Sequence, residues 1–283
     1  MVAGRFRGRR RRTPTTRVTG KSVSYDRRSG QSWPPPNGSV SSSLTIGQDS
    51  IGAYLHDIDG RRVLDVATGR GGFVRSLAES LRDYREIVGV DAAAELSSDF
   101  DEACADLRNV HFEAMDAAHL RFVDASFDTV AISDSLHHLG NPLVVLHEMV
   151  RVLRPGGYLI AAEMFRDGLT MPQRSHAELH HWAAAIDRSM GIIHRETSRR
   201  AELLALLRAL PLEERVVADV SDTADDPKDP ATIAAHEAII ERLLERAGSD
   251  RRLAQRCPRV RQRIETVGIQ GATELLYIAR KPG

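Results

Sequence analysis

Short apolar runs alternate with amphipathic stretches from about residue 61 onwards. Each run ends near a glycine or an acid, which is typical of buried strands in a parallel sheet. The predicted strands lie at 62–66, 86–91, 110–116, 127–133 and 158–162, and the predicted helices between them at 72–82, 93–107 and 142–153, the last stopped by Pro155-Gly156-Gly157. This alternation predicts βαβ units, whose crossovers place a ligand site at the carboxyl ends of the strands.

The pattern changes after residue 163. A helix is predicted at 174–190, with an apolar face made of Leu179, Trp182, Ala183, Ile186 and Met190. A second helix is predicted at 198–209, capped by Thr197 or Ser198, and a third runs from Asp229-Pro230 to about residue 246. Two further strands are expected at 215–220 and 273–279.

Composition narrows the class of protein. The chain has 283 residues, of which 42% are apolar and 28% charged, an ordinary globular mixture. No apolar run approaches the roughly 20 residues of a membrane span. Cys104 and Cys257 are the only cysteines, too few for a disulfide framework. We therefore expect a soluble protein of a reducing compartment, in the cytoplasm.

Charge is distributed unevenly along this neutral chain. Residues 1–43 hold ten basic residues and one acid, which leaves 29 basic and 38 acidic residues in the remainder. Arginine, serine and proline dominate this arm, so we predict that it is disordered. A solvated tail is the favoured interpretation, and contact with nucleic acid or a membrane surface, or an organelle transit peptide, are the alternatives.

Three features coincide at predicted strand ends. The first is the turn Asp65-Val66-Ala67-Thr68-Gly69-Arg70-Gly71-Gly72, where small residues let the backbone approach a ligand closely. The second is Asp91, whose carboxylate could accept from a ribose diol. The third is Asp116, which could accept from an adenine amine. Acids in register on successive strands indicate a nucleoside site.

Two nucleoside ligands compete for this pattern. A dinucleotide such as NAD favours Gly-x-Gly-x-x-Gly, and Asp91 follows Gly71 at the expected distance of 20 residues. However, Val74 stands where the third glycine belongs, and Asp65 would repel a pyrophosphate. A carboxylate beside the turn suits a cation, and S-adenosylmethionine carries a sulfonium and an ammonium group.

The chain resembles the class I S-adenosylmethionine-dependent methyltransferases, and within them the small-molecule branch of the ubiquinone/menaquinone C-methyltransferases. The resemblance covers about residues 61–163 and rests on Val63–Gly72, Val88–Asp91, Asp124–Val130, Leu136-His137-His138-Leu139 and Arg151–Leu159. It implies a Rossmann-like α/β fold with a seven-stranded sheet and a reversed last strand. It also implies one domain over residues 44–283, with helical lid insertions at about 164–197 and 221–270.

By this resemblance, individual positions acquire expected roles. Asp65, Ala67, Gly69 and Gly71 would hold the methionine part of the cofactor, Asp91 and Ala92 the ribose, Asp116 and Ala117 the adenine, and Ser133 would lie near the transferred methyl. Ala67 stands where many members have glycine, although this branch commonly has alanine.

Histidines supply the candidate acceptor-side chemistry. His137 and His138 follow the fourth strand and are either a general base for the acceptor or a structural pair. His180 could face the acceptor from the lid. The apolar face of the helix at 174–190 could likewise line the acceptor cavity as well as pack against the sheet. His176, His180 and Asp187 fall on one helical stripe that could bind a metal, but the polar border of an amphipathic helix is the favoured interpretation, so no metal is expected.

The segment after the fourth strand predicts the class of acceptor. Ser133-Asp134-Ser135-Leu136 replaces the Asn/Asp-Pro-Pro-Tyr of enzymes that methylate flipped bases, and the folded part is acidic. We therefore expect a small-molecule acceptor and no membrane span. An RNA methyltransferase that uses the basic arm is the alternative, and an NAD-dependent dehydrogenase is the weaker one. No pattern indicates an oligomeric state.

Overall fold

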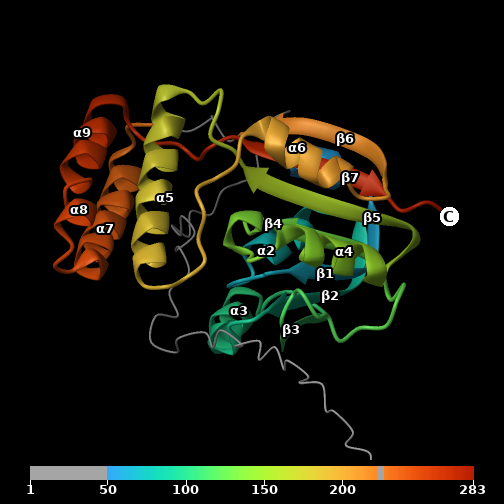
Figure 1. The fold of residues 1–283 in the computed structure, drawn as a ribbon. Helices are drawn as coiled ribbons and strands as arrows, with labels where there is room; N and C mark the ends of the chain where they lie inside the picture. Colours follow the sequence, from blue (N-terminus) through green and yellow to red (C-terminus); the bar gives the residue numbers. More distant parts are fainter. Residues whose placement is uncertain (1–49, 222–225) are drawn as a thin grey trace, which may run out of the picture.

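The computed structural model describes residues 50–221 and 226–283, so the prediction for the arm at 1–43 lies outside the described residues. Within them, seven strands form one sheet in the order β3-β2-β1-β4-β5-β7-β6 (Figure 1). The strands are β1 Asp59–Val66, β2 Asp83–Asp91, β3 Val110–Ala114, β4 Phe127–Ser133, β5 Leu153–Met164, β6 Glu213–Val220 and β7 Glu274–Arg280. Strands β1 to β5 pair in parallel, and β7 lies antiparallel between β5 and β6. The predicted α/β sheet with a reversed last strand is confirmed.

Helices cover both faces of the sheet because successive strand residues point to opposite sides. Val63 packs with α1 (Gly52–Leu55), α2 (Gly72–Ser80) and α3 (Ser97–Ala103) in one apolar cluster. Leu64 packs with α4 (Pro142–Val152) and α6 (Arg200–Arg208) in the other. The strand ends are thus held rigidly between two cores.

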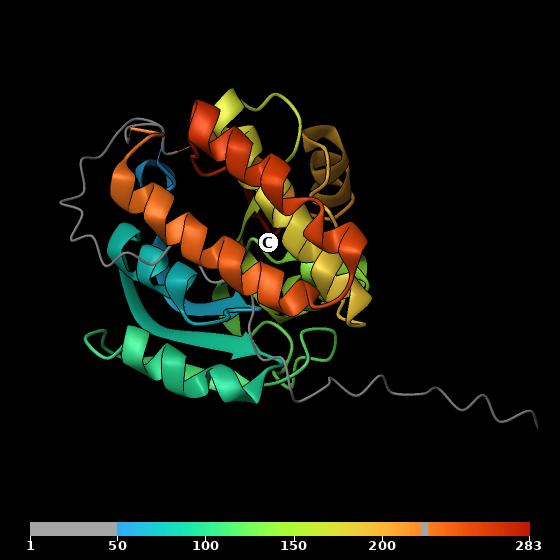
Figure 2. The ribbon, with the colours of Figure 1, turned by 90° about the vertical axis from the view of Figure 1, so that its left-hand side faces the viewer.

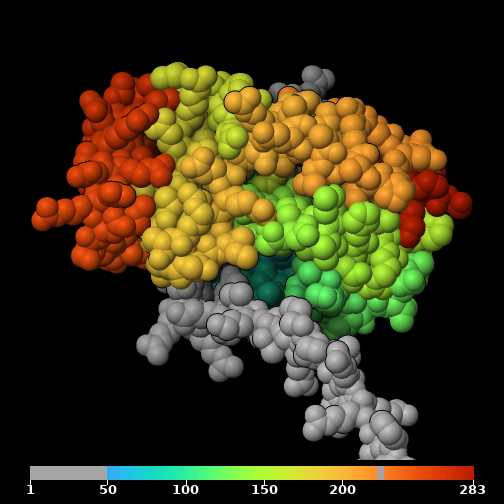
Figure 3. All heavy atoms as spheres, viewed as in Figure 1, coloured from blue at the N-terminus to red at the C-terminus, as the bar shows by residue number. Residues whose placement is uncertain are grey.

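A separate helical layer stands beyond the carboxyl ends of the parallel strands. It consists of α5 Met171–Ser189, α7 Pro230–Ala247, α8 Arg251–Ala254 and α9 Cys257–Val267. Figures 1 and 2 show these helices side by side at one end of the sheet, and they share an apolar cluster of their own. The space-filling view places α5 and the segment after it between the other helices and the sheet (Figure 3). Within the described residues, no helix has the length and apolar content to cross a bilayer.

The apolar face of α5 has a different partner from the one expected. Leu179, Trp182 and Ile186 are fully buried against α7 and α9, and the Trp182 Nε1 donates to the Leu253 carbonyl at 2.9 Å. Met190 is excluded from this face and is 42% exposed. The prediction that this face lines an acceptor cavity is therefore wrong, because neighbouring helices cover it.

Several predicted boundaries were also wrong. The helix expected at 93–107 is a short 3-10 turn, η1 (Ala94–Leu96), followed by α3, which stops where Arg75 Nη1 donates to the Ala103 carbonyl at 2.7 Å. Pro155-Gly156-Gly157 lies inside β5, not before it.

Of the two predicted helix N-caps, the first is wrong and the second is confirmed. Helix α6 begins after Arg199 rather than Thr197 or Ser198, because the Thr197 hydroxyl is already bonded to His181 Nε2 at 2.8 Å. The cap of α7 is confirmed, since Asp229 accepts from the Thr232 amide.

Candidate functional site

The turn between β1 and α2, residues 67–72, is built from left-handed backbone. Ala67, Gly69 and Gly71 have φ of 56°, 54° and 84°. Glycine adopts these angles without strain, whereas alanine does so at a cost. A Cβ on Gly69 would meet no atom within 4 Å, so the turn leaves open space on that side. A Cβ on Gly71 would instead lie 2.8 Å from the Cys104 sulfur, which ties the turn closely to α3.

Asp91 at the end of β2 holds this turn in place. One carboxylate oxygen accepts from the Gly69 amide at 3.0 Å and the other from the Ala93 amide at 2.9 Å. Burial raises the pKa of Asp91, and these backbone bonds oppose the rise. The carboxylate therefore links the ends of β1 and β2.

Asp65 lies beneath the turn and is 1% exposed. Its Oδ2 accepts from the Thr68 hydroxyl at 2.6 Å, while its Oδ1 is buried without a partner among the described residues. Burial raises the pKa of Asp65 to about 7, although the Thr68 bond lowers it. An unpartnered buried carboxylate oxygen suits a cationic ligand group.

The remaining predicted cofactor positions lie at the same edge of the sheet. Asp116, just after β3, is exposed, and its Oδ1 accepts from the Ala118 amide at 2.8 Å. Ala92 is exposed after β2, and Ala117 and Ser133 are half-buried after β3 and at the end of β4. The ends of β1, β2, β3 and β4 are neighbours in the sheet, so the predicted positions are brought together.

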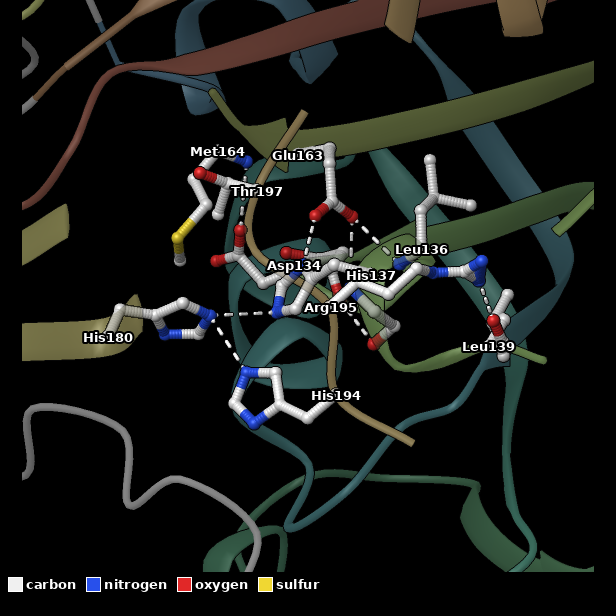
Figure 4. Close-up of polar contacts among 12 residues, drawn as sticks. Asp134, Leu136, His137, Leu139, Glu163, Met164, His180, His194, Arg195 and Thr197 are labelled. Carbon is white, nitrogen blue, oxygen red and sulfur yellow. Dashed lines mark hydrogen bonds and ion pairs between the residues drawn. The ribbon is translucent and has the colours of Figure 1, made fainter. Parts of the chain in front are cut away.

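A second group of polar side chains forms at the ends of β4 and β5 (Figure 4). His137 lies on the 3-10 turn η2 (Leu136–His138), and its Nδ1 contacts the Glu163 carboxyl at the end of β5. The other Glu163 oxygen accepts from the Ser135 and Leu136 amides at 3.0 and 2.8 Å. Glu163 therefore fixes the path of the chain after β4.

His180 from α5 and His194 from the segment after it complete this group. The His180 Nε2 lies 3.1 Å from His137 Nε2 and 3.0 Å from His194 Nε2. We name His137, His180 and His194 the histidine cluster. The Arg195 amide donates to the His137 carbonyl at 2.8 Å, which draws His194 beside the end of β4.

A carboxylate also holds His194. Its Nδ1 contacts Asp187 Oδ2 at 2.6 Å, and the other Asp187 oxygen pairs with Arg246 of α7. His176 lies beside this group: its ring is stacked with that of His180 at 6.5 Å between ring centres, and its Nδ1 accepts from the Ala272 amide at 3.3 Å. The predicted stripe of His176, His180 and Asp187 thus follows one side of the group, and His137 and His194 join it from other segments.

Burial keeps the imidazoles of His137 and His180 neutral. It lowers the pKa of His137 to about 3, with His194 and Arg195 lowering it further, and it lowers the pKa of His180 well below 6.5, with the neighbouring histidines acting in the same direction. Burial also raises the pKa of Glu163 to about 8. Both shifts oppose charge separation, so we describe the His137–Glu163 contact as a hydrogen bond rather than an ion pair.

His138 covers the cluster from one side. Its ring centre lies 4.0 Å from that of His194 and 4.3 Å from that of His137. Burial first, and then the neighbouring imidazoles, lower the pKa of His138 to about 2. The buried position of His138 therefore does not give a general base with a pKa near 6–7.

Sequence reasoning missed Glu163 and the contact of Asp187 with His194. An acid directly after the apolar run 159–162 was the available signal for Glu163. Asp187 and His194 are seven residues apart and meet only because α5 ends between them.

Comparison with known proteins shows what one part of the chain is similar to. Residues 64–161 match the family model described as a methyltransferase domain. This part of the chain is therefore similar to a methyltransferase domain. It resembles the quinone C-methyltransferases: a demethylmenaquinone methyltransferase of Staphylococcus aureus is 33% identical over 118 residues, 42% of this chain and 49% of the relative. The chain therefore spans about half the length of the curated relatives it matches.

Solved structures share the fold of this chain. The [4+2]-cyclase SpnF aligns with a TM-score of 0.57 at 22% identity, over 82% of this chain and 78% of that one. A candidate methyltransferase from Bacillus halodurans aligns with a TM-score of 0.57 at 18% identity, over 82% and 97%. One of these proteins carries the name of a cyclase, so the fold alone does not define the reaction.

Proposed function

We propose that this chain transfers a methyl group from S-adenosylmethionine to a small organic acceptor. The observation that carries the proposal is the joint position of the glycine turn and three acids at the ends of β1, β2 and β3. Two features of the site fit the cofactor. The buried Asp65 Oδ1 lacks a partner among the described residues, and the Gly69 side of the turn is open.

Each residue then has one binding task. Asp65, Ala67, Gly69 and Gly71 hold the methionine part, Asp91 and Ala92 the ribose, and Asp116 and Ala117 the adenine. Ser133 stands at the methyl side, because β4 follows β1 in the sheet. The Asp91 oxygens already accept two amides, and each retains a lone pair for a ribose hydroxyl.

The protein's contribution to the reaction is alignment and exclusion of water. When bound, the cofactor supplies a methyl group that its sulfonium charge already activates for in-line displacement. The helical layer of α5 and α7–α9 stands over the strand ends and serves as the lid. His138 orients the acceptor rather than taking its proton, because burial lowers its pKa to about 2 and makes its imidazole a weak base. The rings of His137 and His180 pack beside that of His138 and hold it in position.

A small-molecule acceptor is favoured over RNA for two reasons. The chain after β4 lacks the Asn/Asp-Pro-Pro-Tyr segment, and the residues beyond the arm carry more acids than bases. The similarity to demethylmenaquinone methyltransferase supports a small acceptor, but it covers only 118 residues. The quinone itself is therefore not carried over to this chain.

Calorimetry with S-adenosylmethionine tests the proposal. Asp91→Ala removes a charged acceptor worth roughly 1.5–3 kcal/mol per hydrogen bond, so affinity should fall by tens-fold. Asp101→Ala, an exposed acid on α3, is the matched control and should bind as the wild type does. Equal affinity in Asp91→Ala, or tight NAD binding by the wild type, would contradict the proposal and favour the dehydrogenase.

A further inference from the structure

Three imidazole nitrogens converge on one point in the histidine cluster. His137, His180 and His194 are each at most 5% exposed, and one nitrogen of each lies within 4.8 Å of the others. The two Nε2–Nε2 separations that involve His180 are 3.1 and 3.0 Å. Figure 4 shows the three rings pointing toward one another from three different segments.

Hydrogen bonding alone does not satisfy this arrangement. The His180 Nε2 carries either one hydrogen or one lone pair, but it faces two nitrogens at bonding distance. As a donor it gives its hydrogen to one neighbouring nitrogen, and as an acceptor it takes a hydrogen from one neighbouring nitrogen. Whichever tautomer His180 takes, one close contact between nitrogens is left without its own proton.

We propose that the histidine cluster binds a divalent transition-metal ion of the zinc type. One central cation would accept all three lone pairs at once and remove the conflict. Imidazole suits such ions, and Zn–N bonds of about 2.0–2.1 Å put tetrahedral ligand atoms about 3.3 Å apart. The two Nε2–Nε2 separations that involve His180 are close to this value, and the His137 and His194 ligand atoms lie within 4.8 Å of one another.

The surroundings match those of known metal-binding histidines. Such ligands usually present their other nitrogen to a carboxylate, which fixes the ring and leaves Nε2 for the metal. His137 has Glu163 in this position, and His194 has Asp187, itself held by Arg246. Two of the three ligands are therefore oriented in advance.

The ligands also join parts of the fold that the chain does not join directly. His137 comes from the end of β4, His180 from the middle of α5 and His194 from the segment after it. A bound ion would fasten the helical layer to the carboxyl edge of the sheet. Three histidines leave the fourth tetrahedral position to water or another ligand atom.

Metal titration of the full chain tests this proposal without any methyl-transfer assay. The chain is stripped with a chelator and titrated with Zn²⁺ against a chromogenic competitor, and Co²⁺ is added separately to read its visible tetrahedral spectrum. We expect one ion per chain and a tetrahedral Co²⁺ spectrum. His194→Ala and His180→Gln should each bind at least about 100-fold more weakly, and Asp187→Asn about 10–100-fold more weakly.

His147→Ala is the matched control, because His147 is exposed on α4 and should leave binding unchanged. Circular dichroism confirms that each variant is folded, and His180→Gln preserves side-chain size if His194→Ala is unstable. Zinc uptake by the wild type no tighter than by folded His180→Gln would overturn the proposal. Cofactor binding is measured separately, so this result is independent of the methyltransferase proposal.

Discussion

The glycine turn after β1 and the histidine cluster occupy the same edge of the sheet, but the chain builds them differently. The turn is made of backbone angles and amides within residues 65–93. The three histidines of the cluster come from η2, α5 and the segment after α5, and the side chains that hold them come from β5, α5 and α7, so that His137 and Arg246 lie more than 100 residues apart. A local motif can therefore reveal the turn, whereas only the fold assembles the cluster.

The region that matches known proteins includes the glycine turn but not most of the histidine side. The family match ends at residue 161, two residues before Glu163. His137 lies inside the matched region, but its contacts at Glu163 and His180 lie beyond it. The glycine turn thus lies within the matched region, while Glu163, His180 and His194 lie outside it.

The largest expected effect is on the histidine side. Glu163→Ala would leave the Ser135 and Leu136 amides and His137 without their acceptor in a buried setting. At about 1–3 kcal/mol for each unsatisfied group, the free energy of unfolding should fall by roughly 3 kcal/mol or more. Urea denaturation measures it, with Glu113→Ala on β3 as the exposed control. A loss no greater than that of the control would mean that Glu163 does not organise this region.

A smaller effect is expected on the cofactor side, and it depends on pH. The pKa of Asp65 is raised to about 7, so the carboxyl is mostly neutral at pH 6 and mostly ionised at pH 8. Affinity for the cationic cofactor should therefore rise about tenfold over this range. Calorimetry at several pH values measures it. In Asp65→Asn the rise should disappear, apart from the ligand's own titration; an equal rise in both proteins would exclude Asp65 as the cause.

The same shift has the opposite sign for stability without ligand. Since the folded chain holds the Asp65 proton more tightly than the unfolded chain, this group favours folding at low pH. Its contribution is lost as the pH rises from the unfolded pKa of about 4 through the folded value of about 7. Ligand binding and stability thus respond to pH in opposite directions at this residue.

The smallest effect concerns backbone strain in the turn. Ala67 has a φ of 56°, so Ala67→Gly should relieve strain and raise the free energy of unfolding by about 0.5 kcal/mol after the entropy of glycine is counted. Thermal unfolding measures it. Ala125→Gly, at a φ of 53° away from the site, is the matched comparison and should gain a similar amount. A loss of stability in Ala67→Gly alone would show that the methyl group of Ala67 makes favourable contacts.

Sequence patterns predicted most of the sheet but little of the histidine side. Apolar runs ending at Val66, Asp91 and Ser133 located strand ends, because buried strands need continuous apolar residues. Helical periodicity grouped His176 with His180, since it compares residues on one helix only. It could not reveal that His180 also contacts His137 and His194, which lie on other segments. Sequence patterns also did not predict which helices pack on the apolar face of α5, because α7 and α9 come much later in the chain.

The place of β7 has a consequence for synthesis on the ribosome. β6 joins the sheet only through β7, and β7 emerges about 50 residues after β6. At about 5–20 residues per second, translation of that stretch takes roughly 3–10 s. During this interval the apolar edge of β5 that later pairs with β7 is open, and such an edge is a template for unwanted strand pairing. The nascent chain therefore carries an unpaired β5 edge until this last strand is made.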